Sequence, residues 1–201
     1  MPDRDRRPSR PRLSREAWED AALEAIAQNG LSALAIEPLA RRLEVSKGSF
    51  YWHFDDREAL LEAVLSRWEQ RSVAAAVDRV ASQRTPQGQF GELLRLALEE
   101  PQLGQLELIF GAAAEHPLIG SCLQRVQGRR LTLFTERLVA LGLAPEVAAR
   151  RALLCCAAQL GLCHLLRTEP SGQAAALDSL LSELVGGWVT QPDEAAPQHH
   201  G

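Results

Sequence analysis

The sequence predicts an all-α protein in which a small N-terminal helical domain is joined by one long helix to a larger helical domain. Hydrophobic residues make up 46% of the 201 residues but aromatic residues only 5%, so alanine and aliphatic side chains dominate, as suits helices. Apolar residues recur at the spacing of a helix face. Glycine and proline gather at breaks, which divide the chain into helical segments.

Two terminal segments lack helical periodicity. Residues 1–12 contain five arginines, two aspartates and no apolar residue after Met1. This composition predicts a disordered basic arm. Residues 192–201 are predicted to form a frayed tail, and the histidine pair in it is too short to indicate a metal site.

The first helix begins at Ser14. Serine is a favoured N-cap, and Leu13 and Trp18 have the spacing of a hydrophobic staple across that helix start. Asn29 and Gly30 supply the end of the helix, because glycine readily adopts the conformation that closes the last turn. This segment is therefore predicted to be one amphipathic helix.

Two short helices then form a helix-turn-helix, which completes a domain at residues 13–56. Leu39 and Leu43 lie on one apolar stripe, and Phe50 and Phe54 lie one turn apart on the next. The break between the two stripes has the length of a tight turn. This motif places its second helix in the major groove of DNA.

The second helix of the motif presents short and cationic side chains at its N-terminal end. Ser46 is a favoured N-cap, which leaves Lys47, Gly48 and Ser49 on the first turn. We expect Lys47 and Ser49 to contact base edges and Gly48 to allow close approach. Arg42 adds positive charge nearby. The net charge of −4 does not exclude a DNA partner, because only charges within about 10 Å of the phosphates matter.

This region resembles the TetR family of bacterial transcription regulators. The resemblance is carried by Leu39-Ala40, Leu43, Val45-Ser46, Gly48, the run 50–54 and the run 57–61. It implies phosphate contacts from Tyr51, His53 and Arg57. Trp52 and Ser14 complete the candidate DNA-binding set. Packing alone is the alternative role for the two neighbouring aromatic residues, and it fits Trp52 better than Tyr51.

Two positions depart from the family pattern. Glu44 stands where the turn usually carries glycine, which indicates either a turn without positive φ or a small strain. Ala35 replaces a hydroxyl residue that in the family caps a helix and touches a phosphate. The arm at 1–12 also has two interpretations, a solvated tail or an arm that reaches into the adjacent minor groove.

A single long helix is predicted from Arg57. Asp55 and Asp56 introduce it, and an apolar face runs from Leu60 to Trp68 and beyond. No glycine or proline interrupts the pattern before residue 86, so the helix spans about 35–40 Å. In the resembled family, ligand binding tilts this helix and changes the separation of the two recognition helices.

The remainder of a domain at 57–191 divides into about five further helices at its proline and glycine breaks. The helices expected at 146–167 and 173–189 are the most apolar, and their faces exceed what a monomer covers. Two helices from each of two chains would make a four-helix bundle, which is where the resembled family forms its homodimer. The predicted interface residues are Ala149, Ala152, Cys156, Leu160, Cys163, Leu177, Leu181, Leu184 and Trp188.

The same domain is predicted to hold an apolar pocket for a small molecule. Its candidate lining comprises apolar and aromatic side chains with a few polar groups, a mixture typical of ligand pockets. The residues are Phe90, Leu94, Gln105, Leu106, Ile109, Phe110, Phe134, Cys155 and Gln159. The alternative, that these side chains simply pack the core, stays open. Sequence indicates no effector beyond a largely hydrophobic, uncharged one.

Several other classes of protein are disfavoured. The chain has no apolar run of the roughly 20 residues that cross a bilayer and no signal peptide, which predicts a cytoplasmic protein. It carries no catalytic motif, so we expect no enzyme, no cofactor and no metal. The four cysteines lack paired spacing, which favours buried reduced thiols over a redox or metal sensor.

Together these features favour a ligand-responsive transcriptional regulator. We expect a repressor that binds a palindromic operator as a homodimer and is released by a small, largely hydrophobic inducer. The alternatives are an all-α enzyme and a helical adaptor that has lost DNA binding. The basic residues around the second motif helix argue against the adaptor.

Overall fold

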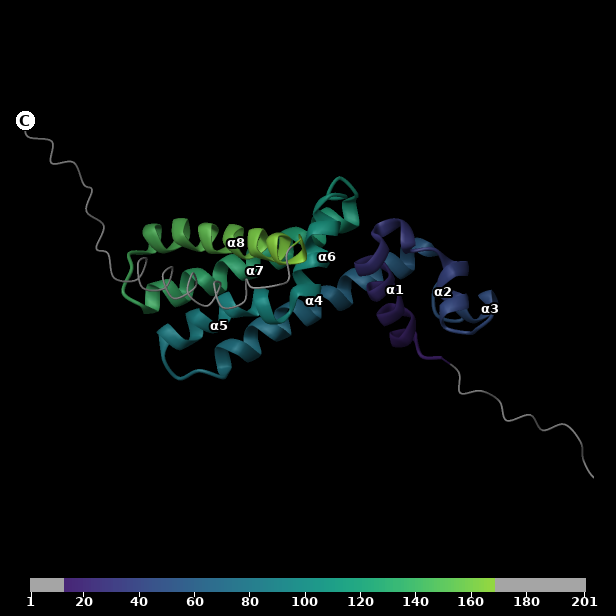
Figure 1. The fold of residues 1–201 in the computed structure, drawn as a ribbon, viewed down its shortest axis with the longest axis horizontal. Coiled ribbons are helices and arrows are strands. Elements are labelled where there is room, and N and C mark those ends of the chain that lie inside the picture. Colours follow the sequence, from purple (N-terminus) through teal and green to yellow (C-terminus); the bar gives the residue numbers. More distant parts are fainter. Residues whose placement is uncertain (1–12, 169–201) are drawn as a thin grey trace, which may run out of the picture. The chain divides into compact units, whose positions relative to one another are not determined.

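The computed structural model describes residues 13–168, apart from the side chains of 97–99, 101 and 166–168. Every regular element in this part of the chain is helical, which confirms the predicted all-α class (Figure 1). The expected basic arm, the last expected helix and the tail lie outside the described residues.

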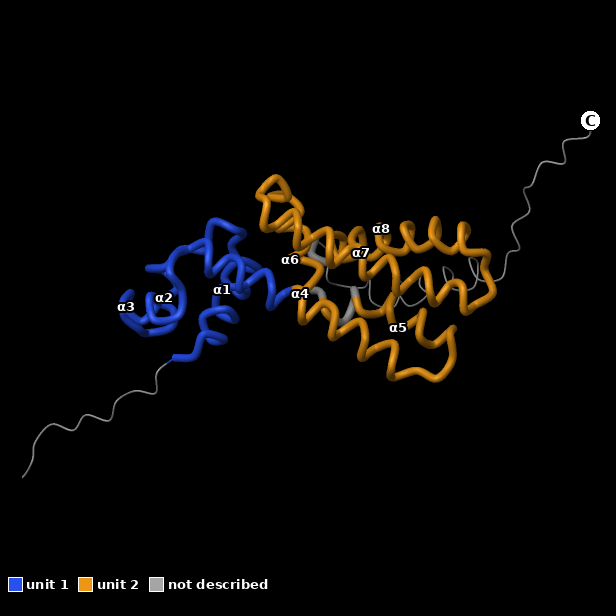
Figure 2. The backbone as a smooth tube through the Cα atoms, turned by 180° about the vertical axis from the view of Figure 1, so that it is seen from behind, with its two compact units in different colours: residues 1–68 blue, residues 69–201 orange. Residues whose placement is uncertain are grey.

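The chain divides into two compact units, residues 1–68 and 69–201, and the division falls within the long helix α4 (Figure 2). The predicted domain boundary, at 56 and 57, coincides with the start of that helix. In chain order the elements are α1 (Arg15–Asn29), η1 (Leu31–Ala33), α2 (Ile36–Arg42), α3 (Lys47–Phe50), α4 (Arg57–Ala81), α5 (Pro86–Glu99), α6 (Pro101–Gly111), α7 (Pro117–Ala140) and α8 (Pro145–Thr168).

The first unit is organised around Trp18 and Phe50, which are both fully buried. Their rings meet edge to face with centroids 5.4 Å apart, and Phe50 stacks on Phe54 at 5.4 Å. As predicted, Ser14 caps α1, where its Oγ accepts a hydrogen bond from the Ala17 N–H at 3.2 Å. Because α3 has only four residues, it cannot be stable alone, and this aromatic packing holds it in place.

The start of α4 belongs to the first unit and is fixed to α1. The Asp56 carboxylate accepts a hydrogen bond from the Ala59 N–H at 2.8 Å, which caps the helix. Farther along, Arg67 makes two hydrogen bonds with the Asp20 carboxylate, and the Nη2–Oδ2 distance is 2.8 Å. The predicted apolar face is buried, as shown by Leu60, Leu61, Val64, Leu65 and Trp68.

The turn between α2 and α3 requires a left-handed residue. Glu44 has φ of 54°, the one positive φ of a non-glycine residue in the described chain. The hydrogen bond from the Val45 N–H to the Ala40 carbonyl, 3.0 Å long, closes the turn around it. Of the two possibilities for this departure from the family pattern, a turn without positive φ is therefore wrong, and a strained turn is correct.

This strain predicts opposite outcomes for two substitutions that both remove the Glu44 carboxylate. Glu44→Gly should be more stable than Glu44→Val by about 1–2 kcal/mol, because a β-branched residue is disfavoured at positive φ and glycine is not. Comparing the two variants cancels any contribution of the carboxylate itself. Urea unfolding of both measures the difference, and equal midpoints would show that the turn stores no strain.

Prolines begin the helices of the second unit. Four of them occupy the first position of α5, α6, α7 and α8, where the missing N–H would have had no helical partner. These are the breaks that the sequence predicts. The core of the unit packs residues of α4, α5, α7 and α8 around Phe90 and Phe134, whose rings meet edge to face at 5.8 Å. Other core members are Ala76, Leu93, Leu94, Leu138, Ala148, Ala152 and Cys155.

Candidate nucleic-acid interface and cavity

Lys47 lies at the N-terminal end of α3 with about half of its side chain exposed. Its Nζ is 3.0 Å from Oε1 of Glu37 on α2. The hydrogen bond to Lys47 and the charge of Lys47 lower the pKa of Glu37, and Glu37 raises the pKa of Lys47 in the same way. Because both groups are exposed, water and salt weaken the pair. Lys47 can therefore exchange this partner for a phosphate or a base edge.

Ser46 and Gly48, the residues on either side of Lys47, leave the N-terminal end of α3 uncapped by a side chain and uncrowded. Ser46 occupies the predicted N-cap position with an extended backbone, but its hydroxyl makes no capping hydrogen bond. A Cβ at Gly48 would lie 3.6 Å from Ser46 Oγ, an ordinary contact. The fold itself therefore does not require glycine at 48. Close approach to DNA stays the prediction for Gly48, and base contact stays the prediction for the half-buried Ser49.

The aromatic residues after α3 differ in their surroundings. Trp52 is 79% exposed and Tyr51 is 53% exposed, whereas Phe50, the residue before them, is fully buried in the core. Tyr51 still packs edge to face on Phe50 at 5.2 Å. The packing alternative is therefore wrong for Trp52. The backbone carbonyl of His53 accepts a hydrogen bond from Nη1 of Arg15 at 3.3 Å, which ties this segment to α1.

Three of the predicted DNA-contacting residues hold the fold together. Arg57 donates from Nε to the Leu34 carbonyl at 2.6 Å, so it fixes the start of α4 to the loop before α2. Arg42 lies 2.6 Å from a Glu24 carboxylate oxygen and fixes α2 to α1. Ser14 caps α1. Sequence reasoning missed the first two contacts, which join residues distant in the chain. Contacts of these three residues with phosphates stay predictions.

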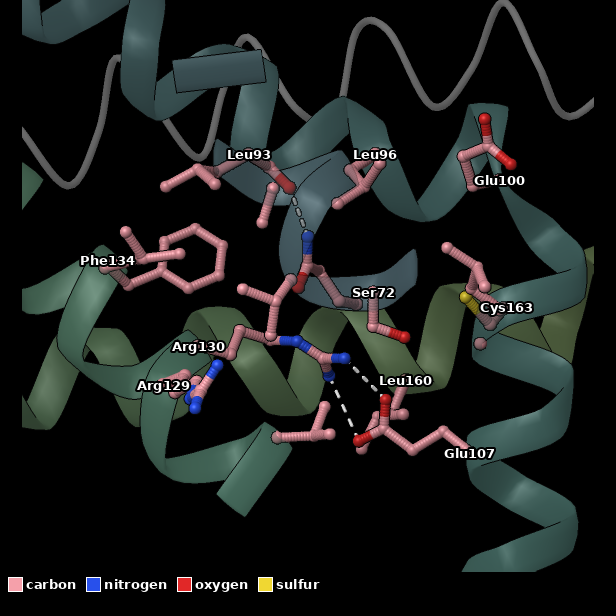
Figure 3. Close-up of a pocket in the computed structure, with 17 residues that line it drawn as sticks. Ser72, Leu93, Leu96, Glu100, Glu107, Arg129, Arg130, Phe134, Leu160 and Cys163 are labelled. Carbon is pink, nitrogen blue, oxygen red and sulfur yellow. Dashed lines mark hydrogen bonds and ion pairs between the residues drawn. The ribbon is translucent and has the colours of Figure 1, made fainter. Parts of the chain in front are cut away.

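The second unit contains a cavity of about 50 Å³ lined by α4, α5, α6, α7 and α8 (Figure 3). Its lining surface is mostly apolar, with Phe134 at one side. Typical ligand pockets have volumes of about 300–1,000 Å³. The cavity is therefore a small apolar chamber that a ligand would have to widen.

The polar groups in the cavity wall are mostly engaged. Arg130 makes two hydrogen bonds with the Glu107 carboxylate, at 2.6 and 3.1 Å, and Glu107 is 3% exposed (Figure 3). Gln159 donates from Nε2 to the Leu93 carbonyl. The Arg130–Glu107 pair joins α7 to α6 across the cavity, and no sequence signal pointed to it. A buried pair of this kind is sensitive to loss of either partner.

Two of the nine predicted pocket residues, Phe134 and Gln159, line this cavity. The others pack elsewhere in the described structure. Gln105 and Ile109 are half-buried. The fully buried ones are Phe90, Leu94, Leu106, Phe110 and Cys155. Helical periodicity identifies a buried face but not which part of that face borders a cavity. The sequence therefore could not distinguish the two residues that line the cavity from the seven that do not. A ligand role for the seven stays a prediction.

None of the four cysteines forms a disulfide, and three of them are buried. Burial raises the pKa of Cys122 and of Cys156 to about 11 and that of Cys155 to about 12. Burial also raises the pKa of Cys163. These shifts disfavour the thiolate form that oxidation and metal binding need, which supports the predicted structural role.

We therefore expect the native thiols to resist alkylation at pH 8. A rise in pKa from 9 to about 11 lowers the thiolate fraction at this pH about 100-fold, and burial slows the reaction further. Intact-protein mass spectrometry after iodoacetamide treatment should show four adducts in denaturant and almost none in the native protein. Rapid modification of one native cysteine would favour the sensor alternative instead.

An apolar surface runs along α8, but it is rotated from the predicted interface. Leu153, Leu154 and Leu165 are each more than half exposed. Ala152 and Cys163 are instead buried inside the unit, where the Cys163 sulfur lies so close to Gly104 of α6 that a Cβ there would clash with it. Ala149 is exposed, whereas Cys156 and Leu160 are half-buried. The other predicted interface residues, Leu177, Leu181, Leu184 and Trp188, lie outside the described residues.

The described residues offer few other kinds of site. Among them, no group of three or more histidine, cysteine or acidic side chains could hold a metal ion. None of the helices in this part of the chain is long and apolar enough to cross a membrane.

Residues 20–64, which include α2, α3 and the turn between them, match the family model described as bacterial regulatory proteins of the tetR family. The helix-turn-helix region of the chain belongs to the TetR family. This confirms the resemblance carried by the helix-turn-helix residues, and it supports a regulator rather than an enzyme. The match ends within α4, so the family model covers residues of the first unit only and none that line the cavity.

Two curated proteins are similar to part of the chain. The class D tetracycline repressor protein of Escherichia coli is 38% identical over 69 residues, which are 32% of this chain and 32% of the repressor. The regulator BetI of Burkholderia ambifaria is 30% identical over 118 residues, 56% of this chain and 60% of BetI. The chain thus matches about a third of the TetR-family repressor and less than two thirds of BetI.

A solved structure shares the fold over most of the chain. A transcriptional regulator from Rhodococcus sp. Rha1 has a TM-score of 0.74 and 21% sequence identity, covering 88% of this chain and 96% of that one. At this identity the likeness concerns the fold alone. It confirms the predicted combination of a helix-turn-helix domain with a helical C-terminal domain.

Proposed function

We propose that the protein is a transcriptional repressor that binds a palindromic operator as a homodimer and is released by a small, largely hydrophobic inducer. One observation carries this proposal. Lys47, at the N-terminal end of α3, is exposed to solvent, and the buried Trp18–Phe50 pair supports the helix from below. These residues lie in or next to the segment that matches the TetR family. A similar protein is named as a tetracycline repressor. As a cytoplasmic protein, it would have direct access to the chromosome.

DNA binding is tested by selecting operators from random duplexes and then comparing two variants of equal charge. Lys47→Ala should weaken operator binding about tenfold and make the log–log salt slope less steep by about one, because one cation leaves the interface. The control is Arg84→Ala, which removes an exposed cation from the other unit and should change neither quantity. Equal behaviour of the two variants would refute the assignment of Lys47 to the interface.

The homodimer is supported by the exposed apolar surface of α8. Leu153, Leu154 and Leu165 are three large apolar side chains on one helix that are each more than half exposed, and exposed apolar patches often mark an interface. A second copy of the chain would cover this surface in a two-fold symmetric, isologous contact. Such symmetry matches a palindromic operator, whose half-sites lie about 34–36 Å apart. Light scattering measures the mass directly: Leu154→Glu should shift a dimer towards monomer, and a monomeric wild type would contradict the proposal.

Coupling between ligand and operator is supported by the position of α4 in the sequence. Its first residue, Arg57, holds the Leu34 carbonyl in the first unit, and its later residues Ser72, Val73 and Ala76 line the cavity in the second. A ligand that widens the cavity must displace these later residues. Because α4 is continuous from Arg57 to Ala81, that displacement would bias the DNA-binding end.

Thermodynamic linkage makes this coupling measurable in both directions. An inducer should weaken operator binding by the same factor by which the operator weakens inducer binding, typically about 5- to 150-fold. Ligand affinity is therefore measured with and without operator at fixed salt. Equal affinities would mean that α4 joins the units without coupling them.

A further inference from the structure

The cavity contains a hydroxyl that lacks a partner. Ser72, on α4, is 9% exposed, and within the described part of the chain its Oγ has no hydrogen-bond partner. Figure 3 shows this hydroxyl among the side chains that line the cavity, on the side of Leu160 and Cys163. Buried hydroxyls are nearly always hydrogen-bonded, because burial without a partner costs free energy. An unpartnered one in a cavity wall therefore indicates a place for a polar atom of a ligand.

Among the described residues, the charges in the cavity wall leave no excess of either sign. Glu107 and Arg130 neutralise each other through two hydrogen bonds. The two further charged residues that the described wall contains, Glu100 and Arg129, are also of opposite sign. An ionic ligand would lack a buried counter-charge there, and a buried unpaired charge is strongly unfavourable. The remaining wall is mostly aliphatic.

We infer that the effector is an uncharged, mostly apolar molecule with one hydrogen-bonding oxygen, an alcohol or a carbonyl, that binds the Ser72 hydroxyl. This inference rests on the proposed function and names the class of its inducer. Because Ser72 belongs to α4, the polar atom of the ligand would act on the helix that continues into the DNA-binding unit. The apolar part would occupy the space bordered by Leu93, Phe134 and Leu160.

The first test uses the ligand-free protein. Ser72→Ala removes an unpartnered buried hydroxyl and should raise the melting temperature by about 2–4 °C. The control is Ser82→Ala, since the exposed Ser82 hydroxyl donates to the Arg79 carbonyl at 2.7 Å, and it should not raise the melting temperature. The cavity has room for a water molecule. If Ser72→Ala lowers the melting temperature, a water or another group already satisfies the hydroxyl, and the inference is wrong.

The second test uses probes that are matched in shape and differ in one oxygen. The pairs are benzyl alcohol with ethylbenzene and 1-naphthol with 1-methylnaphthalene, and 1-naphthoate serves as the anionic probe. In at least one pair the alcohol should bind about three- to tenfold more tightly than the hydrocarbon, which is the value of one hydrogen bond. Ser72→Ala should abolish this preference, and Ser72→Thr, which keeps the hydroxyl, should retain it.

The outcomes separate this inference from the proposed function. Equal binding within the pairs, a preference for 1-naphthoate, or no binding of any probe would overturn the inference. Operator binding by the probe-free protein is measured in parallel. If the protein binds no DNA but Ser72 still selects alcohols, the proposed function fails and the ligand class stands. If alcohol and hydrocarbon probes release the operator equally well, from the wild type and from Ser72→Ala alike, the proposed function stands and the ligand class fails.

Discussion

Replacing Phe50 with alanine is expected to lower the free energy of unfolding of the first unit by about 3–5 kcal/mol and to abolish operator binding. Phe50 is fully buried and touches both Trp18 and Phe54, so the substitution leaves a cavity beneath α3. The four-residue helix depends on this packing, because so short a helix is unstable alone. Loss of the ring should therefore release Lys47 from its position.

Two further variants separate loss of stability from loss of the reading surface. Phe50→Leu keeps most of the apolar volume and should cost less than about 1.5 kcal/mol, with measurable DNA binding. Phe90→Ala makes the same change in the core of the second unit, where it should destabilise the protein without removing the α3 surface. Chemical denaturation and operator titration are measured for all three. Wild-type DNA affinity in a folded Phe50→Ala would contradict the account of the interface.

Replacing Glu107 with glutamine is expected to lower the free energy of unfolding of the second unit by about 3–5 kcal/mol. The carboxylate is buried and lies 2.6 Å from Nη2 of Arg130, whose side chain is 20% exposed. Glutamine keeps the shape of glutamate but leaves the guanidinium of Arg130 without a counter-charge in a largely apolar wall. An uncompensated buried charge is much more costly than the intact pair is stabilising.

A double substitution distinguishes this effect from a general loss of packing. Glu107→Leu combined with Arg130→Met removes both charges at similar volume, and its stability should lie near or above that of the wild type. Arg137→Met is the control, because Arg137 pairs with the exposed Glu136 and bonds to the neutral side chain of Gln89. This variant leaves no buried carboxylate without its partner, so it should cost less than Glu107→Gln. Urea unfolding of the variants gives the free energies. A double variant as unstable as Glu107→Gln would show that the pair contributes through packing and not through charge compensation.

Features encoded over a few residues could be predicted from the sequence. The cap at Ser14 and the four prolines that begin helices act through backbone groups within one turn. The apolar face from Leu60 to Trp68 also follows local periodicity, and the helix-turn-helix combines such local signals. The fold class and the family resemblance therefore came from residues whose spacing carries the information directly.

Features that depend on contacts between distant residues could not be predicted. Arg57 bonds to the Leu34 carbonyl, and Arg130 pairs with Glu107, which is 23 positions away. No sequence pattern around either arginine indicates its partner. The small residues of α8 were predicted to form a dimer interface, but part of that stripe faces α6, where Cys163 lies against Gly104. Small residues indicate close helix approach without indicating which helix approaches.

We propose that the N-terminal end of α3 contacts the operator, and Lys47 allows a direct measurement because it is the only lysine in the chain. An amine-acylating reagent therefore has one side-chain target, which is half exposed in the free protein. Mass spectrometry should show that acylation of Lys47 slows in proportion to the fraction of protein bound by the operator. A duplex of scrambled sequence at the same concentration and salt should give much less protection. Acylation of Lys47 at the same rate with and without saturating operator would contradict the claim.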